Sequence, residues 1–302
     1  FWLLLLRLLN GVFSGFVPNS TALIASQVPK NQSGYALGTL STGTVAGTLM
    51  GPLLGGLIAE QFGMRNVFLL VGFFLFLVSV LTWWGIEEDY QQISKEEHLS
   101  SWTLLASIQH KDILLGLFLT SMTIQMIGQS ISPILPLYVR ELGQSNNIIF
   151  VSGLIVSAMG ISSILTSGWM GKLGDRIGNH RLLLLALLYS GILYIFCALA
   201  QTPFQLGLLR FLFGIGTGAL MPGVTALLNR MTPKEGISRI FSYNQLFFYV
   251  GGVLGPMIGS SIAMHVNYHW VFYGTAILAF IDLAFLLFIF RKYLKVREIS
   301  AH

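Results

Sequence analysis

Nine long apolar stretches, separated by short polar segments, run along the whole chain. A transmembrane helix needs about 20 mostly apolar residues, and each stretch is long enough to supply one. The pattern predicts nine membrane-spanning helices, at residues 1–27, 35–59, 66–86, 112–141, 148–170, 182–200, 205–229, 239–264 and 271–290. The expected fold class is therefore an all-α polytopic membrane protein.

The longest polar stretch separates the third predicted helix from the fourth. It opens with Glu87, Glu88 and Asp89 and continues to Lys111. A polar stretch between periodic segments is typical of a linker. We expect a partial N-terminal half at residues 1–86, a cytoplasmic linker at 87–111, and a C-terminal six-helix half with its tail at 112–302.

Composition and charge agree with this interpretation. Hydrophobic residues make up 54% of the chain and charged residues only 10%, and the mean hydropathy is +0.73. The basic residues fall in short tracts between apolar spans, so we expect no nucleic-acid partner. Counted over alternate loops, Arg65 and Arg140 lie on one side of the membrane, and the other side has Lys30, Lys95, Lys111, Lys172, Arg176, Arg181, Arg230, Lys234, Arg239, Arg291, Lys292, Lys295 and Arg297.

This bias predicts the orientation of the chain. Cytoplasmic loops carry the excess of Lys and Arg, so the richly basic side is expected to be cytoplasmic. The C-terminus lies on that side. We expect a multi-pass protein of the plasma membrane, in contact with the lipid bilayer, whose first helix runs inward.

A stripe of glycines marks the second predicted helix. Gly43, Gly47, Gly51 and Gly55 follow one another at steps of four, and Pro52 and Gly56 lie beside them. That spacing puts the four glycines on one helix face. In a membrane, small residues on one face allow a neighbouring helix to approach closely, and a proline is tolerated as a kink. The stripe predicts a tight helix–helix contact.

The chain also contains a long internal repeat with an offset of 203 to 204 residues. The arginine and glycines that start with Arg7 recur from Arg210, and the glycine–proline pattern around Pro52 recurs around Pro256. Predicted helices one to three therefore correspond to helices seven to nine, and three counterparts are lacking. We expect an intact molecule of twelve helices in two parallel halves, of which this chain, beginning at Phe1 inside a helix, is an N-terminally truncated piece.

Three motifs give this architecture a family resemblance. Residues 171–181, which include Gly171, Asp175, Arg176, Gly178 and Arg181, resemble the signature loop of the major facilitator superfamily. The glycine–proline helix resembles the antiporter motif of its drug:proton branch. Arg7-Leu-Leu-Asn10-Gly11 resembles that branch's R-x-x-Q-G motif, with Asn10 in place of Gln. The resemblance is strongest to Gram-positive multidrug efflux pumps and implies family helices 4–12.

The resemblance suggests how protons are coupled to transport. It implies a role in proton transfer for Arg7. Asp282 is the acid nearest the middle of a predicted span, and an ionisable residue there is functional by default. Two roles are open for Asp282: proton coupling, or a neutral, hydrogen-bonded role in helix packing. Arg7 and Arg210 are either functional or snorkel to the nearby interface.

A polar stripe lies on the fourth predicted helix, at Ser121, Gln125, Gln129, Ser132 and Pro136. Amides are costly against lipid, so the stripe faces either a substrate cavity or an interhelical hydrogen-bond seam. We also assign Arg210, Tyr243 and Asn244 to the candidate cavity. For Asp175 and Arg176 the resemblance implies a cytoplasmic latch that engages the helix beginning near Ser238; the alternative is a solvated orientation signal.

Other chemistries are not supported by the sequence. His265 and His269 have metal-like spacing but no third ligand, so no metal and no cofactor are expected. No paired carboxylates or nucleophile–base set lies in a span, so the chain is not expected to be an enzyme. We expect a monomeric secondary transporter that exports drugs or small amphiphilic compounds in exchange for protons by alternating access. The alternatives are sugar or metabolite efflux and a non-transporting sensor or scaffold.

Overall fold

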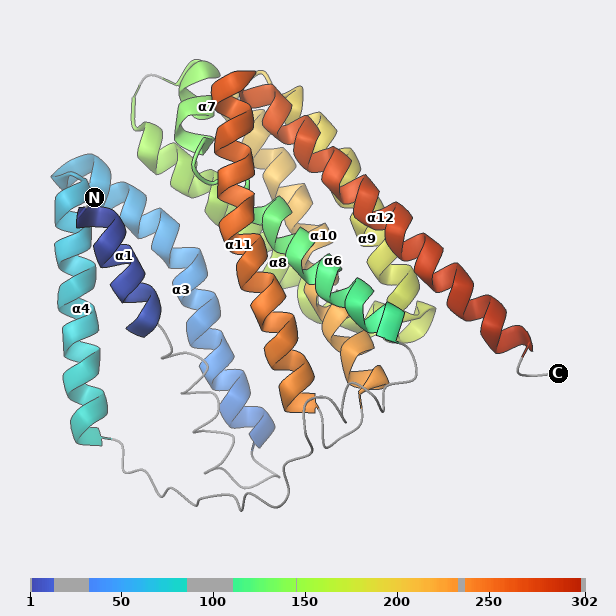
Figure 1. Ribbon diagram of the computed structural model, residues 1–302. Coiled ribbons are helices and arrows are strands. Elements are labelled where there is room, and N and C mark those ends of the chain that lie inside the picture. The colour runs from blue at the N-terminus through green and yellow to red at the C-terminus, as the bar shows by residue number, and fades with distance from the viewer. Residues whose placement is uncertain (1, 14–32, 86–110, 145, 233–236, 300–302) are drawn as a thin grey trace.

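The computed structural model describes residues 2–13, 33–85, 111–144, 146–232 and 237–299, which are almost wholly helical (Figure 1). In chain order these are α1 (Trp2–Phe13), α3 (Ser33–Phe62), α4 (Met64–Gly85), α6 (Lys111–Gln129), α7 (Leu135–Glu141), α8 (Ile148–Ile177), α9 (Asn179–Ala198), α10 (Pro203–Met231), α11 (Ile237–His265) and α12 (Tyr268–Ile299). Seven of them are long and apolar enough to cross a membrane. The all-α polytopic class is confirmed.

The predicted span at 112–141 is wrong as a single helix. It is broken into α6 and α7 by turns at residues 130–134. Pro133 and Pro136 lack a backbone N–H, and the N–H groups of Ser132 and Ile134 bond to carbonyls three residues back. Pro136 then falls in the first turn of α7, where proline is favoured.

The segment at 171–181 is not the loop that we expected. Helix α8 continues through Ile177 and α9 begins at Asn179, so Gly178 alone joins them. Gly178 has a φ of 95°, which glycine adopts without strain, and its N–H bonds to the Gly174 carbonyl. A helix of 30 residues is about 45 Å long, so its polar end extends beyond a hydrocarbon core of about 30 Å.

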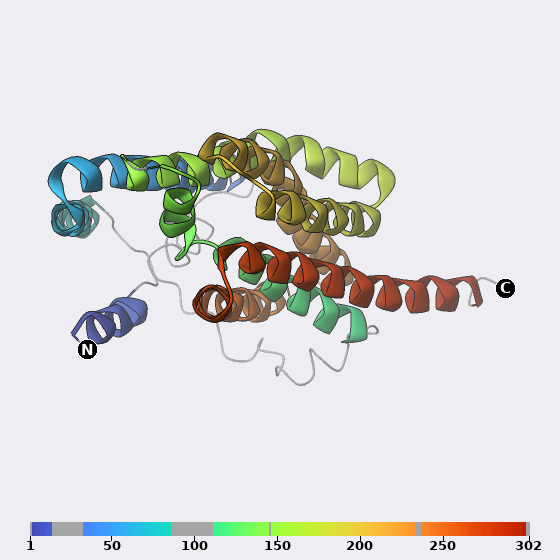
Figure 2. The ribbon, with the colours of Figure 1, turned by 90° about the horizontal axis from the view of Figure 1, so that it is seen from above.

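The helices α6 to α12 form one bundle, in which α10 lies along α8, α11 along α6, and α12 along α9 (Figures 1 and 2). Two apolar clusters fill it. One includes Leu117, Leu187 and Leu286, and the other includes Tyr138 and Phe272. Helix α3 joins this bundle through α8, and α4 packs on α3.

The two ends of the bundle carry different charge. The end with the Gly178 turn presents exposed basic side chains at Lys111, Lys172, Arg176, Arg181 and Arg291, and the opposite end presents Arg65 and Arg140. The predicted linker at 87–111 lies almost wholly outside the described residues.

Candidate functional site

Glycines on both helices make a close contact between α3 and α8. A Cβ at Gly153 would collide with the Pro52 carbonyl, and one at Gly56 would lie 3.0 Å from the Ile149 carbonyl oxygen. Backbone therefore meets backbone here. The predicted stripe of Gly43, Gly47, Gly51 and Gly55 does not make this contact, since a Cβ at any of its members would meet no described atom of a neighbouring helix within 4 Å.

The repeated stripe on α11 does pack closely. A Cβ at Gly251 would collide with the Met122 carbonyl of α6, and one at Gly255 would lie 2.7 Å from the Met126 carbonyl oxygen. A Cβ at Gly259 would collide with the carbonyl of Ser130, the first residue after α6. Each step of four along α11 matches a step of four along α6. The two helices therefore lie parallel with their backbones in contact, as expected for a small-residue stripe in a membrane.

The polar stripe of α6 divides in two. Ser121 is buried and donates a hydrogen bond of 2.7 Å to Asn244 Oδ1 of α11, which is an interhelical seam. Gln125 and Gln129 are only half-buried. Ser132 lies in the turn beyond α6 and donates to Gln129 Oε1 at 3.0 Å. Of the other cavity candidates, Tyr243 packs on the apolar cluster that contains Leu117.

Asp282 lies inside the bundle rather than at its surface. Its side chain is 5% exposed, and Oδ1 accepts a hydrogen bond of 3.1 Å from Thr120 Oγ1 of α6. Its other oxygen, Oδ2, is buried with no hydrogen-bond partner in the described part of the chain. The sequence analysis did not single out Thr120. It could have been noticed as a second hydroxyl next to Ser121, on a different face of an otherwise apolar helix.

Arg210 is a buried cation, 3% exposed, and its guanidinium reaches neighbouring helices. One Nη donates a long hydrogen bond of 3.4 Å to the Tyr194 hydroxyl of α9, which itself donates to the Ile127 carbonyl of α6. The guanidinium carbon lies 5.9 Å from the Tyr194 ring and 5.8 Å from the Phe213 ring, within cation–π range. Its Nε has no partner among the described residues.

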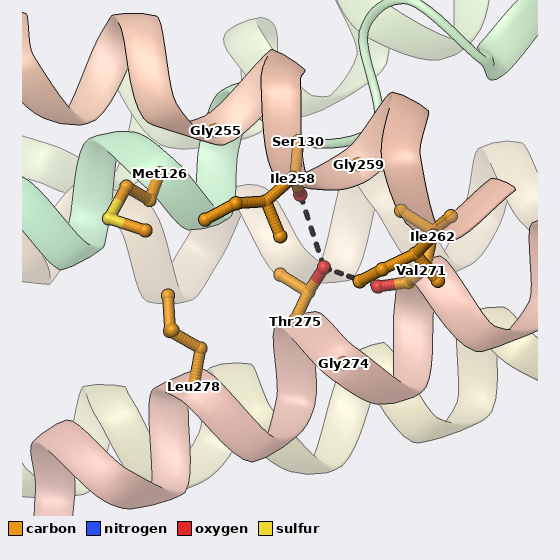
Figure 3. A pocket seen from close by; sticks show the side chains of 10 residues that line it. All are labelled: Met126, Ser130, Gly255, Ile258, Gly259, Ile262, Val271, Gly274, Thr275 and Leu278. Atoms are coloured by element: carbon orange, nitrogen blue, oxygen red, sulfur yellow. Dashed lines mark hydrogen bonds between the residues drawn. The ribbon is translucent and has the colours of Figure 1, made fainter. Parts of the chain in front are cut away.

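A small apolar groove lies where α11 and α12 diverge, against the end of α6 (Figure 3). Its hydroxyls come from Ser130 and Thr275. These two lie 3.1 Å apart, and Thr275 also donates to the Val271 carbonyl. Both hydroxyls are thus satisfied internally, and the groove offers an apolar surface.

The remaining predicted residues lie away from this interior. Asp175 and Arg176 are exposed in the last turn of α8, and Arg181 is exposed at the start of α9. The backbone of Arg7 lies in α1, but its side chain is outside the described residues. His269 contacts the Ala198 carbonyl and Glu141, and no group of three metal-binding side chains occurs in the described ranges.

The profile of the Major Facilitator Superfamily matches residues 1–152 and 113–301. The chain belongs to the major facilitator superfamily. It is 62% identical over 299 residues to the multi-drug resistance efflux pump PmrA of Streptococcus pneumoniae, covering 99% of this chain and 75% of that protein. A PmrA homolog of Lactococcus lactis is 52% identical over the same length, covering 99% and 74%, and the multidrug resistance protein MdtG of Salmonella arizonae is 48% identical over 274 residues, covering 90% and 68%.

A solved structure shares this fold. A bacterial homolog of the human lysosomal transporter Spinster, in an inward-facing and unoccupied conformation, matches with a TM-score of 0.74 at 16% identity, over 92% of this chain and 75% of the other. The chain is thus a multi-pass membrane protein of a small-molecule transporter family and not an enzyme. The expected resemblance to multidrug efflux pumps is confirmed.

Proposed function

We propose that this protein exports drugs or small amphiphilic compounds in exchange for protons. The observation that carries the proposal is the 62% identity to the efflux pump PmrA over nearly the whole chain. Three further features support the proposal: the internal repeat, the buried ionisable side chains and the glycine contacts. A transporter needs polar groups inside an apolar bundle and helices that can move against one another.

In the proposed alternating-access cycle, the half at residues 1–86 moves against the half at residues 112–302. The linker at 87–111 joins the two halves. The contact of α3 with α8 at Gly153 is where the halves meet in the described structure. Gly153 lies in the second turn of α8, at the end opposite Gly178, and we assign the closed side of the transport cycle to that end. Movement of α3 from α8 would open it.

The substrate cavity is assigned to the partly exposed polar face of α6 and the adjoining face of α11. Gln125, Gln129 and Ser132 supply amide and hydroxyl groups. Tyr243 and Asn244 belong to the adjoining part of α11, where Asn244 is buried in its bond to Ser121 in the described arrangement. Arg210 is connected to the cavity helix α6 indirectly: it donates to the Tyr194 hydroxyl, which donates to the carbonyl of Ile127. One protein molecule is the working unit.

Proton coupling is assigned to Asp282 and Arg7. Oδ2 of Asp282 is buried without a donor among the described residues, and protonation would remove the cost of an unpartnered buried charge there. The end of the bundle that carries Lys172, Arg176 and Arg181 is assigned to the cytoplasm by its positive charge. This places the C-terminus in the cytoplasm and leaves Asp175 as the acidic member of a latch there.

The proposal is tested in proteoliposomes with an imposed pH gradient and no ATP. A fluorescent cationic dye such as ethidium should accumulate against its concentration gradient, and a protonophore should collapse the accumulation. Accumulation that ignores the protonophore but requires sodium would replace the proton with another ion. If no dye, sugar or metabolite accumulates with the protein present and folded, the sensor or scaffold alternative is favoured.

Substitution of Gly153 by valine should bias the protein toward the state in which α3 and α8 are apart. The new side chain meets the Pro52 backbone, and overpacking of this kind costs about 1–3 kcal/mol. Spin labels are attached to cysteines introduced at Leu57 and Leu154 in a Cys197→Ser background. Double electron–electron resonance then measures the distance between the labels, and hence the populations with α3 and α8 together and apart. Gly168→Val is the control, because Gly168 on the same helix faces open space among the described residues. Equal distance distributions for both variants would contradict the gating role of this contact.

A further inference from the structure

Two adjacent residues of α6 bind two different helices. Thr120 Oγ1 donates to Asp282 Oδ1 of α12 at 3.1 Å, and Ser121 Oγ donates to Asn244 Oδ1 of α11 at 2.7 Å. All four side chains are buried. Successive residues of a helix point about 100° apart, so one turn of α6 connects the carboxylate on one side to the amide on the other.

The carboxylate of Asp282 is held by this one hydroxyl. Thr120 is the only donor that it has in the described part of the chain, and Oδ2 has none. The other titratable or charged side chains that the structure describes on α6, α9, α11 and α12 lie at helix ends or make contacts elsewhere. They are Lys111, Asp112, His180, Arg181, Tyr189, Tyr194, Cys197, Tyr243, Tyr249, His265, Tyr268, His269, Tyr273 and Arg291. No described cation neutralises the acid, so a proton on Oδ2 is the means of neutralising it.

We propose that Thr120 is a positioning residue that sets the protonation of Asp282, and that Ser121 passes the change to Asn244. This inference rests on the proposed proton coupling. A proton from the aqueous phase binds Oδ2 and converts the carboxylate to a neutral acid. The hydroxyl of Thr120 then no longer faces a charged acceptor, its hydrogen bond weakens, and α6 can shift against α12. Because Ser121 is the next residue, the same shift alters its bond to Asn244 on the cavity side.

The protonation step is measured without any transported ligand. Infrared difference spectroscopy of the whole protein in nanodiscs follows the carbonyl band of the protonated acid, which Asp282→Asn should remove. Thr120→Val takes a donor from the ionised form, so the titration midpoint of the band should rise by about one pH unit. Thr120→Ser keeps the donor and should retain the wild-type midpoint.

Thr275→Val is the matched control. It removes another buried threonine hydroxyl, one bonded to Ser130 and the Val271 carbonyl, and should leave the midpoint unchanged. If Thr120→Val does not fold, Thr120→Ala serves in its place. A wild-type midpoint in the valine or alanine variant, or an equal shift in the serine variant, would overturn the role of Thr120.

The transmission step is measured as ethidium affinity against pH. In the wild type the affinity should change about 5-fold or more between the two protonation states, the usual scale of coupling between sites. Ser121→Ala should leave the infrared midpoint in place and bring this ratio close to one. A ratio unchanged by Ser121→Ala would overturn transmission through α6. If Asp282→Asn leaves both the carbonyl band and pH-dependent transport intact, the proposed proton site itself is wrong, which is a separate outcome.

Discussion

Arg210→Met should abolish most transport while leaving the fold at least as stable. Arg210 is buried, its Nε has no partner among the described residues, and no described carboxylate is paired with it. Replacing an imperfectly compensated buried charge by an apolar side chain of similar length is often neutral or stabilising. We expect the transport rate to fall roughly 10- to 100-fold, which corresponds to about 1.5–3 kcal/mol of activation free energy.

The chain supplies its own reporter for the stability measurement. Cys197 is its single cysteine and is buried, so a thiol-reactive fluorescent dye reports unfolding on heating. Transport is measured by pH-driven ethidium accumulation. Arg210→Lys keeps the charge without the planar guanidinium and should retain part of the activity. Wild-type accumulation by the methionine variant would make Arg210 a structural residue only.

Gly251→Ala should destabilise the protein, whereas Gly252→Ala should not. A Cβ at Gly251 collides with the Met122 carbonyl of α6, and backbone cannot move aside as a flexible side chain can. We expect a loss of about 1–3 kcal/mol from overpacking. A Cβ at Gly252 would lie 3.5 Å from Gln125 Nε2, an ordinary contact, and alanine is favoured over glycine in a helix by about 1 kcal/mol.

The two variants form a matched pair, because they add the same methyl group to adjacent residues of α11. Their melting temperatures, followed through Cys197, should move in opposite directions. Gly251→Leu should be worse than the alanine variant and should prevent accumulation of folded protein in the membrane. Equal melting temperatures for the two alanine variants would show that α11 and α6 are not held by backbone contact at this point.

The sequence predicted the helices well where apolar length alone decides the outcome. The segments from residue 148 to 264 form α8 to α11, and apart from the C-terminal end of α8 their ends lie within three residues of the prediction. About 20 apolar residues in lipid have to be helical to satisfy their own backbone. Pro133 and Pro136 also indicated the break between α6 and α7. We did not predict it, because the apolar run continues through both prolines. The polar end of α8 was misassigned because helices continue past the hydrocarbon core.

The chain by itself thus determined the membrane class, the repeat and the family, since length, composition and spacing are properties of a single segment or of two segments compared. Only the tertiary structure decided which polar and glycine residues meet. The stripe at Gly251 packs against α6, whereas a Cβ at Gly47 would meet no described atom of a neighbouring helix within 4 Å, although the spacing of the two stripes is the same. Helical periodicity fixes which side chains share a face, but the partner of that face, and hence the bond of Thr120 to Asp282 and the enclosure of Arg210, depends on helices far away in the sequence.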